Sequence, residues 1–294
     1  HFRSNPTTDR ADVVIDDLSD TVTWLGSAST DYTYSLTRDD GLNRGLQVGN
    51  GHLRIEDLTV DVTDRVYVGA SPSAARLSIG SGGMLRCKTL SLGKGSGAAT
   101  VSVENGAHSD SGLVADTIYL NGETFTTNES SRVVVNDLSG FGSAVDHFNG
   151  RLAFGTSVGS TTASYSVFSG QSLTVGGDLL VGYDKPATFT QTGGTVSAGP
   201  TSGLHIAGQP GSDGSSYSLS GGTLLGGVDV GEPVVGTGAE GTLTQSGGTI
   251  DGTGVSVNSG GTFHYSGGTI TGSLWLQPGA TLHLNADMAL GGHV

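Results

Sequence analysis

Two groups of acidic residues are the first places where this sequence could support chemistry. The first group consists of Asp39-Asp40, with Asp31 nearby and Asp16-Asp17 upstream. Paired carboxylates can act as acid and base in glycoside hydrolysis, and they can also bind Ca²⁺. Asp40 is followed by glycine, however, and this dipeptide is common in turns. Because the group also lies outside the repeats described below, we predict a solvated turn here and no catalytic site.

The second acidic group lies among basic residues. Glu56-Asp57, Asp61 and Asp64 are interleaved with Arg54 and Arg65. Charges of both signs in a short stretch are typical of an exposed segment with local ion pairs. We therefore predict exposed loop charges in this group, with a Ca²⁺ site as the alternative.

A serine motif is the next candidate. The segment Gly155-Thr-Ser157-Val-Gly159 matches the letters of the nucleophile elbow of serine hydrolases. That motif requires a strand, a tight turn and then a helix, and the Ser/Thr-rich stretch after Gly159 does not favour a helix. We therefore assign no nucleophile to Ser157.

The histidines are the remaining residues that could bind a metal. All eight are too widely spaced for the short ligand patterns typical of zinc sites. His205, His264 and His283 alternate with apolar neighbours, so we expect them to face solvent, with a stacked histidine ladder as the alternative. The sequence thus predicts no catalytic, metal-binding or cofactor-binding residue and no enzymatic activity.

The composition of the 294 residues favours an all-β protein. Glycine accounts for 51 residues, hydrophobic residues for 35% and charged residues for 14%. This much glycine destabilises helices, and a chain with only 7 prolines and no three-residue glycine period is not collagen. The single cysteine, Cys87, cannot form an intrachain disulfide bond.

The net charge of the chain and its N-terminal residues indicate which partners it can bind and where it is located. A net charge of -14 disfavours nucleic acid and anionic membrane surfaces as partners, because both attract basic proteins. The chain has no apolar run long enough to cross a bilayer, so we predict no membrane insertion. It begins at His1 without Met or an apolar leader, which we interpret as a bacterial protein after removal of its export signal. We therefore expect an extracellular or cell-surface protein.

Internal repeats organise most of the chain. One signature is an apolar residue, any residue and a second apolar residue, usually followed by Gly or Asn. Its copies begin at Leu46, Val66, Leu90, Ile118, Leu152, Leu179, Leu204, Val228, Val255 and Leu274. The longest gap between copies contains Val133-Val-Val135, which we interpret as a further short strand.

A second signature lies between these copies. It reads Thr188-Phe-Thr-Gln-Thr-Gly-Gly-Thr-Val196 and returns at 217–224, 242–250 and 262–270. Each repeat therefore consists of a strand, a Gly-Gly corner, a short strand, a variable loop and a third strand that ends in a Gly or Asn corner.

The physical properties of this unit indicate a parallel β-solenoid. Alternating apolar residues place one face of each short strand inward, and Gly and Asn tolerate the backbone of sharp corners. Three short strands bury little by themselves, so the repeats must stack, about 4.8 Å apart, as parallel sheets. We predict an all-β parallel β-solenoid (β-helix) of about ten coils with three short strands per coil. A β-sandwich built from hairpins is the alternative.

The two ends of the chain differ from the regular repeats. Residues 1–45 do not carry the repeat, and we assign them to an N-terminal cap or strand-donating extension before a solenoid domain at 46–294. The sequence stops within repeat-like material without a charged cap, and unpaired strand edges tend to pair with other chains. We predict head-to-tail self-association, with a cap folded onto its own first coil as the alternative. The residues predicted to associate are Val13, Val14, Ile15, Val22, Trp24, Leu25, Leu282, Leu284, Met288 and Leu290.

Two neighbouring strings resemble the repeats of known proteins. Leu180-Val-Gly-Tyr-Asp184 and Thr188–Val196, the second returning at Thr242–Ile250, are similar to the β-strand repeats of bacterial surface proteins. The proteins concerned are autotransporter-passenger-like and sorting-signal-bearing repeat proteins. The resemblance covers about residues 46–294. It implies export and a parallel β-helix.

These features together predict a structural extracellular protein. We expect a rod-like subunit that forms a homo-oligomer or homopolymer, as a fibre, sheath or surface layer. One other class left open is a cell-surface adhesin or carbohydrate-binding module, with a surface polysaccharide as its partner. Another is a polysaccharide lyase or hydrolase of the β-helix class, which would need several acids or a basic residue on one sheet. No Lys or Arg follows Lys185, which disfavours that class.

Overall fold

The structure is a computed structural model. It describes residues 13–25, 33–36, 45–69, 74–93, 98–104, 112–119, 124–127, 132–139, 145–158, 160–199, 203–231, 239–288 and 290–291. Strands, turns and loops make up all of these ranges. The chain divides into two compact units, unit 1 with most of residues 1–133 and unit 2 with most of residues 134–294.

The described residues of unit 2 form two six-stranded sheets and six consecutive strands of a 16-stranded sheet. These six strands, called the first sheet below, are β12 (Arg151–Phe154), β15 (Leu179–Val181), β18 (Leu204–Ile206), β21 (Val228–Val230), β24 (Gly254–Val257) and β27 (Ser273–Leu276). The second sheet is formed by β13 (Ala163–Val167), β16 (Ala187–Gln191), β19 (Ser215–Leu219), β22 (Gly241–Gln245), β25 (Thr262–Tyr265) and β28 (Thr281–Leu284). The third sheet is formed by β11 (Val145–Phe148), β14 (Ser172–Val175), β17 (Thr195–Ser197), β20 (Thr223–Leu225), β23 (Thr249–Asp251) and β26 (Thr269–Ile270).

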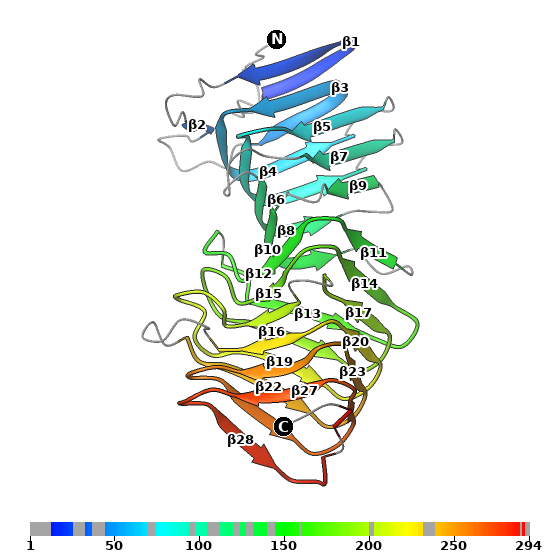
Figure 1. The fold of residues 1–294 in the computed structure, drawn as a ribbon. Coiled ribbons are helices and arrows are strands. Elements are labelled where there is room, and N and C mark those ends of the chain that lie inside the picture. The colour runs from blue at the N-terminus through cyan, green and yellow to red at the C-terminus, as the bar shows by residue number, and fades with distance from the viewer. Residues whose placement is uncertain are drawn as a thin grey trace. The chain divides into compact units, whose positions relative to one another are not determined.

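One coil of unit 2 takes one strand from each of the three sheets in turn. The chain runs from β12 to β13 and β14 and then begins the next coil at β15, directly beside β12. All pairs between successive coils are parallel, as the order of β14, β17, β20 and β23 in Figure 1 shows. This arrangement confirms the predicted parallel β-solenoid and its three strands per coil. It contradicts the alternative sandwich, because hairpins would pair neighbouring strands in antiparallel fashion.

The core of unit 2 consists of columns of inward-facing side chains, each contributed by the same position of successive coils. In the first sheet, Leu152, Leu179 and Leu204 form such a column and are fully buried. In the second sheet the rings of Phe189 and Tyr217 stack, with centroids 4.8 Å apart and planes at 6°. The alternation seen in the sequence corresponds to burial of every second residue in β16, β19 and β22, whereas all three residues of β15 are buried.

Unit 1 is built from nine strands, and a tenth lies at its boundary with unit 2. The nine strands are β1 (Val13–Leu25), β2 (Thr33–Leu36), β3 (Leu46–Glu56), β4 (Thr59–Val68), β5 (Ala75–Ile79), β6 (Met84–Leu92), β7 (Ala99–Val103), β8 (Gly112–Tyr119) and β9 (Thr124–Thr127). The tenth, β10 (Arg132–Ser139), contains the predicted extra strand at 133–135. All pairings given for unit 1 are parallel as well.

The coils of unit 1 are less regular than those of unit 2. Leu46–Val48 pairs with Val66–Val68 one coil later, whereas the rest of β3, Gly51–Ile55, pairs with β5. Two strands of one coil are thus joined into one long strand that turns a corner without a break. The solenoid has about 7 regular turns rather than the ten predicted, plus an N-terminal part. All ten copies of the first signature nevertheless lie in strands of one sheet, so the two counts differ in how many of the copies belong to regular turns.

The N-terminal segment pairs with its own chain. β1 is one strand with register shifts on both sides of Asp16, and it runs parallel to β3. β2 likewise runs parallel to β4. The assignment of this segment to a cap or a strand-donating extension stays a prediction. Within the ranges that the structure describes, no helix could cross a membrane.

Candidate association surface at the C-terminal coil

The last coil of unit 2 exposes side chains that are buried in the coils before it. Leu276 is 47% exposed although its partner in β24, Val257, is fully buried. Leu284 is 54% exposed, whereas its partner in β25, Tyr265, is 2% exposed. The inward column therefore continues into β27 and β28, but there it faces solvent.

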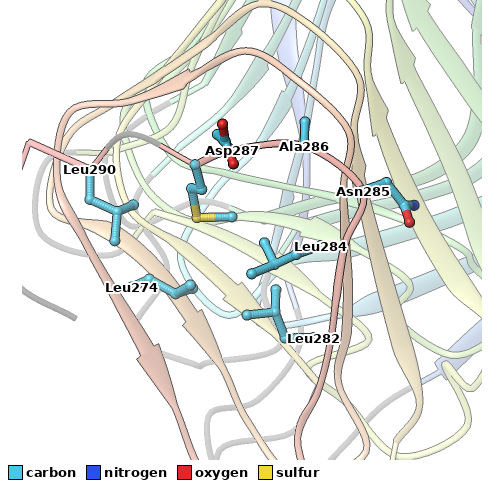
Figure 2. Close-up of a pocket in the computed structure, with 8 residues that line it drawn as sticks. Leu274, Leu282, Leu284, Asn285, Ala286, Asp287 and Leu290 are labelled. Carbon is cyan, nitrogen blue, oxygen red and sulfur yellow. The ribbon is translucent and has the colours of Figure 1, made fainter.

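The exposed cross-section of this coil is hollow, and most of the residues around it are apolar, although polar atoms also line it. A cavity of about 690 Å³ is lined by Leu274, Leu282, Leu284, Asn285, Ala286, Asp287, Met288 and Leu290. Figure 2 shows that the leucine side chains surround one common space. Leu290 completes the coil on its third side, because it forms a parallel bridge with Ile270 of β26.

All four C-terminal residues that the sequence predicted to associate line this cavity. Leu282, Leu284, Met288 and Leu290 come together from β28 and the segment that follows it. Sequence reasoning missed Leu274, although it belongs to the first repeat signature and continues the column that begins at Leu152. Recognising that column as a core position would have added Leu274 to the prediction.

The predicted N-terminal residues lie along β1, and their placement is known from the register of the backbone. Val13 and Ile15 are opposite Leu46 and Val48, and Val22 and Trp24 are opposite Leu53 and Ile55. All four partners in β3 are fully buried core residues. Val14 and Leu25 instead lie opposite Gln47 and Glu56, which are half-buried. In register, the first four thus align with core positions of β3, and the other two align with its half-buried positions.

The acidic groups that the sequence singled out form no catalytic arrangement among the described residues. Asp31 and Asp39-Asp40 lie outside those residues, and Asp16-Asp17 lies within β1. In the second group, Arg54 contacts Glu56 and lies 2.8 Å from Glu104. In the ranges that the structure covers, no three His, Cys, Asp or Glu side chains are placed to hold a metal ion.

Two further arginines contact this second group. Arg65 lies 3.7 Å from Asp64, and Arg86 lies 3.6 Å from Asp61. These side chains are half-buried or exposed, so each contact contributes little to stability. The predicted exposed loop is wrong for most of this group, because Arg54 and Glu56 lie in β3 and the residues from Asp61 to Arg65 lie in β4, where parallel pairing to the next coil holds them.

Ser157 lies in an exposed turn after β12, and the next regular element is the strand β13. Its hydroxyl lies 3.4 Å from the Asp184 carboxylate, and the structure shows no contact between it and a histidine base. The strand, turn and helix of a nucleophile elbow are therefore not formed here, as the sequence predicted.

The three histidines that were expected to face solvent divide into two environments. His264 and His283 stack on the outer face of the second sheet, with ring centroids 4.5 Å apart and planes at 7°, so a two-residue histidine ladder exists. His205 is in the first sheet and takes no part in it. Its Nδ1 is 3.3 Å from Asp229, and its Nε2 is 3.9 Å from Asp178.

The group around His205 is one that sequence reasoning missed. Asp178 and Asp229 both raise the pKa of His205, although partial burial acts in the opposite direction. Burial raises the pKa of Asp229, and His205 partly offsets that effect. Asp178 also contacts Arg151 at 3.0 Å. The sequence did contain one signal that could have predicted this group, because charged residues recur near the first signature in successive repeats.

Comparison of this chain with known proteins gives no match to a protein family, to a curated protein or to a solved structure.

Proposed function

We propose that the protein is a structural, extracellular rod-like subunit whose copies associate head to tail through the C-terminal coil. The observation that carries this proposal is the open end of unit 2, where an apolar coil cross-section is exposed together with two strands. Exposed apolar surface of this kind is typical of an interaction site. The proposal includes no enzymatic activity, and the resemblance to bacterial surface repeats supports an extracellular location.

The occupant that we propose for this surface is the first coil of a second copy. At the C-terminal coil, β27, β28 and the residue of the Leu290 bridge each pair in parallel with the preceding coil. At the other end, two segments of β1 pair in parallel with β3, and β2 pairs in parallel with β4. A contact between the two ends could therefore continue the same parallel pairing. Among the described residues, no strand pairs with the outer edges of β27 and β28. A parallel strand from another copy would satisfy these backbone groups and cover Leu276 and Leu284.

Such a contact joins two different surfaces, so it need not close on itself. Repetition of the contact would add copies along one direction and produce a filament. A fibre, sheath or surface layer is the expected product.

The experiment compares two leucine substitutions in unit 2. Leu284→Arg places a charge in the exposed coil end, whereas Leu225→Arg places the same charge at a 36% exposed leucine in β20, away from that end. Sedimentation velocity and negative-stain imaging should show concentration-dependent filaments for the unmodified chain and for Leu225→Arg. Leu284→Arg should be monomeric, with an unchanged circular dichroism spectrum. A monomeric unmodified chain, or filaments that persist in Leu284→Arg, would refute the proposal.

A further inference from the structure

A column of residues on the outer face of the first sheet combines an exposed aromatic ring with polar side chains. His205, Asp229, Ser256 and Trp275 occupy the same register position in β18, β21, β24 and β27. Their neighbours along each strand point into the core, so these four residues lie on the opposite face. Successive members lie about 4.8 Å apart, and the column therefore spans roughly 14 Å along the solenoid.

Trp275 provides the apolar part of this column. Its side chain is 47% exposed, although tryptophan is usually well buried. Its position in the middle of a strand holds the backbone beneath the ring in place. A ring fixed in this way on an open face can stack against a flat apolar ligand surface, while its N–H remains able to donate a hydrogen bond.

Asp229 and His205 provide the polar part. The Asp229 side chain is 36% exposed and that of His205 is 24% exposed, so both groups are accessible from the same side as Trp275. The contact between them, 3.3 Å from the imidazole Nδ1 to the carboxylate, restricts the orientation of both side chains. A restricted carboxylate accepts hydrogen bonds from ligand hydroxyl groups at a small entropic cost.

We propose that this column binds an extended, neutral, β-linked glucan chain that lies along the solenoid. Each sugar ring of such a chain has an apolar face, which would stack on Trp275, and hydroxyl groups at its edge. Those hydroxyl groups would reach Ser256, Asp229 and His205 in turn, because each ring extends the chain by a distance similar to the strand spacing. The site uses the outer face of the sheet, whereas the self-association proposed above uses the free edge of β27 and the interior of the coil.

The charge of the chain favours a neutral ligand over an acidic one. Residues 186–294 contain six Asp or Glu residues and no Lys or Arg. A polyanionic glycan would be repelled by Asp229 and by this surrounding charge. A neutral glucan is not repelled by these charges, and the Asp229 carboxylate can accept hydrogen bonds from its hydroxyl groups.

The test uses the fluorescence of Trp275 in the full chain. The sequence contains two tryptophans, so Trp24→Phe leaves Trp275 as the only reporter. Titration with cellohexaose should shift the emission of Trp275 and saturate, and affinity should increase from cellobiose to longer oligomers. Oligogalacturonate of the same length serves as the polyanionic probe and should leave the emission unchanged. The same titration in the Leu284→Arg background separates glucan binding from self-association.

Substitutions then assign the binding energy to the column. Trp275→Ala should weaken binding to hydroxyethylcellulose, measured by affinity electrophoresis, on the order of tenfold. Trp275→Tyr should restore most of the loss, because it retains an aromatic platform, and Asp229→Asn should weaken binding less than Trp275→Ala. Thermal melting verifies that each variant is folded. Absence of a fluorescence change with cellohexaose, or equal binding by a folded Trp275→Ala variant, would overturn the proposal.

Discussion

The hydroxyl of Tyr217 donates a 2.6 Å hydrogen bond to Oε1 of Gln191, one coil away in the interior of unit 2. Both residues are fully buried. The Gln191 amide nitrogen donates in turn to the carbonyl oxygen of Thr223 at 3.0 Å. A single buried amide therefore links its own coil to the Tyr217 side chain and to the backbone of β20, both of which belong to the next coil.

The first prediction is that Tyr217→Phe destabilises unit 2 by about 1–3 kcal/mol, because it leaves Oε1 of Gln191 buried without its hydroxyl partner. Urea unfolding of the single variants and of the double variant with Gln191→Leu measures the coupling. The double variant should lose less than the sum of the two single losses. Simple additivity would show that the hydrogen bond contributes no coupling energy.

Gln245 provides an internal comparison for this prediction. It takes the register position of Gln191 two coils later, with Leu219 between them. Its Oε1 is buried and, among the described residues, has no hydrogen-bond partner. Gln245→Leu removes this unsatisfied group, so it should cost less stability than Gln191→Leu in the same assay.

The second prediction concerns the Gly-Gly corners. Gly194 has a φ of +66°, and a Cβ there would overlap the carbonyl oxygens of Gln171 and Phe168. Gly170 has a φ of +83°, but a Cβ there would meet nothing within 4 Å. Gly170→Ala should therefore cost only the left-handed strain, about 1–2 kcal/mol. Gly194→Ala should cost about 1–3 kcal/mol more because of the overlap. Equal midpoints of thermal unfolding for the two variants would contradict this account of the corner.

The third prediction is a pH dependence caused by His205. Asp178 and Asp229 raise its folded-state pKa above the ordinary value of 6.5. A raised folded-state pKa means that the folded state binds the proton more tightly than the unfolded state. The stabilisation is therefore complete below the unfolded-state value and is lost as pH rises through the folded-state pKa.

Melting temperatures of the unmodified chain and of His205→Gln, measured between about pH 5 and pH 9, test this dependence. The difference in stability between the two proteins should shrink as pH rises across this range. Asp178→Asn should lower the pKa of His205 and move the change to lower pH. Parallel pH profiles for the unmodified chain and for His205→Gln would contradict the assignment.

The fourth prediction concerns the reactivity of Cys87. The side chain lies in β6 of unit 1 and is 1% exposed, and burial raises the pKa of its thiol. The thiolate is the reactive form, so the folded protein should react slowly with a disulfide reagent such as DTNB. Because Cys87 is the only cysteine, the colour that DTNB releases measures the reaction of this thiol alone. The reaction should accelerate sharply in denaturing urea, and rapid labelling without urea would show that unit 1 opens readily.

The sequence by itself determined the local features of this protein. The period-2 alternation determined which residues of each strand are buried, and the glycines at 193–194 and 247–248 determined where the chain turns corners. Stacking followed from these features, because short strands with one apolar face must be covered by their neighbours. The four C-terminal residues named from this pattern come together at the open coil end, and their role in association stays a prediction.

Only the tertiary structure decided which residues of different coils meet. The loops between signatures vary in length, so the repeat does not specify which outer residues share a column. His205 lies between Asp178 and Asp229, and Ser256 precedes Trp275, because of the pairing register, which is a non-local property. The merging of strands in β3 and the pairing of β1 within its own chain were decided in the same way. In both cases the backbone hydrogen bonds to the next coil, and not the local preference of the residues, determine the outcome.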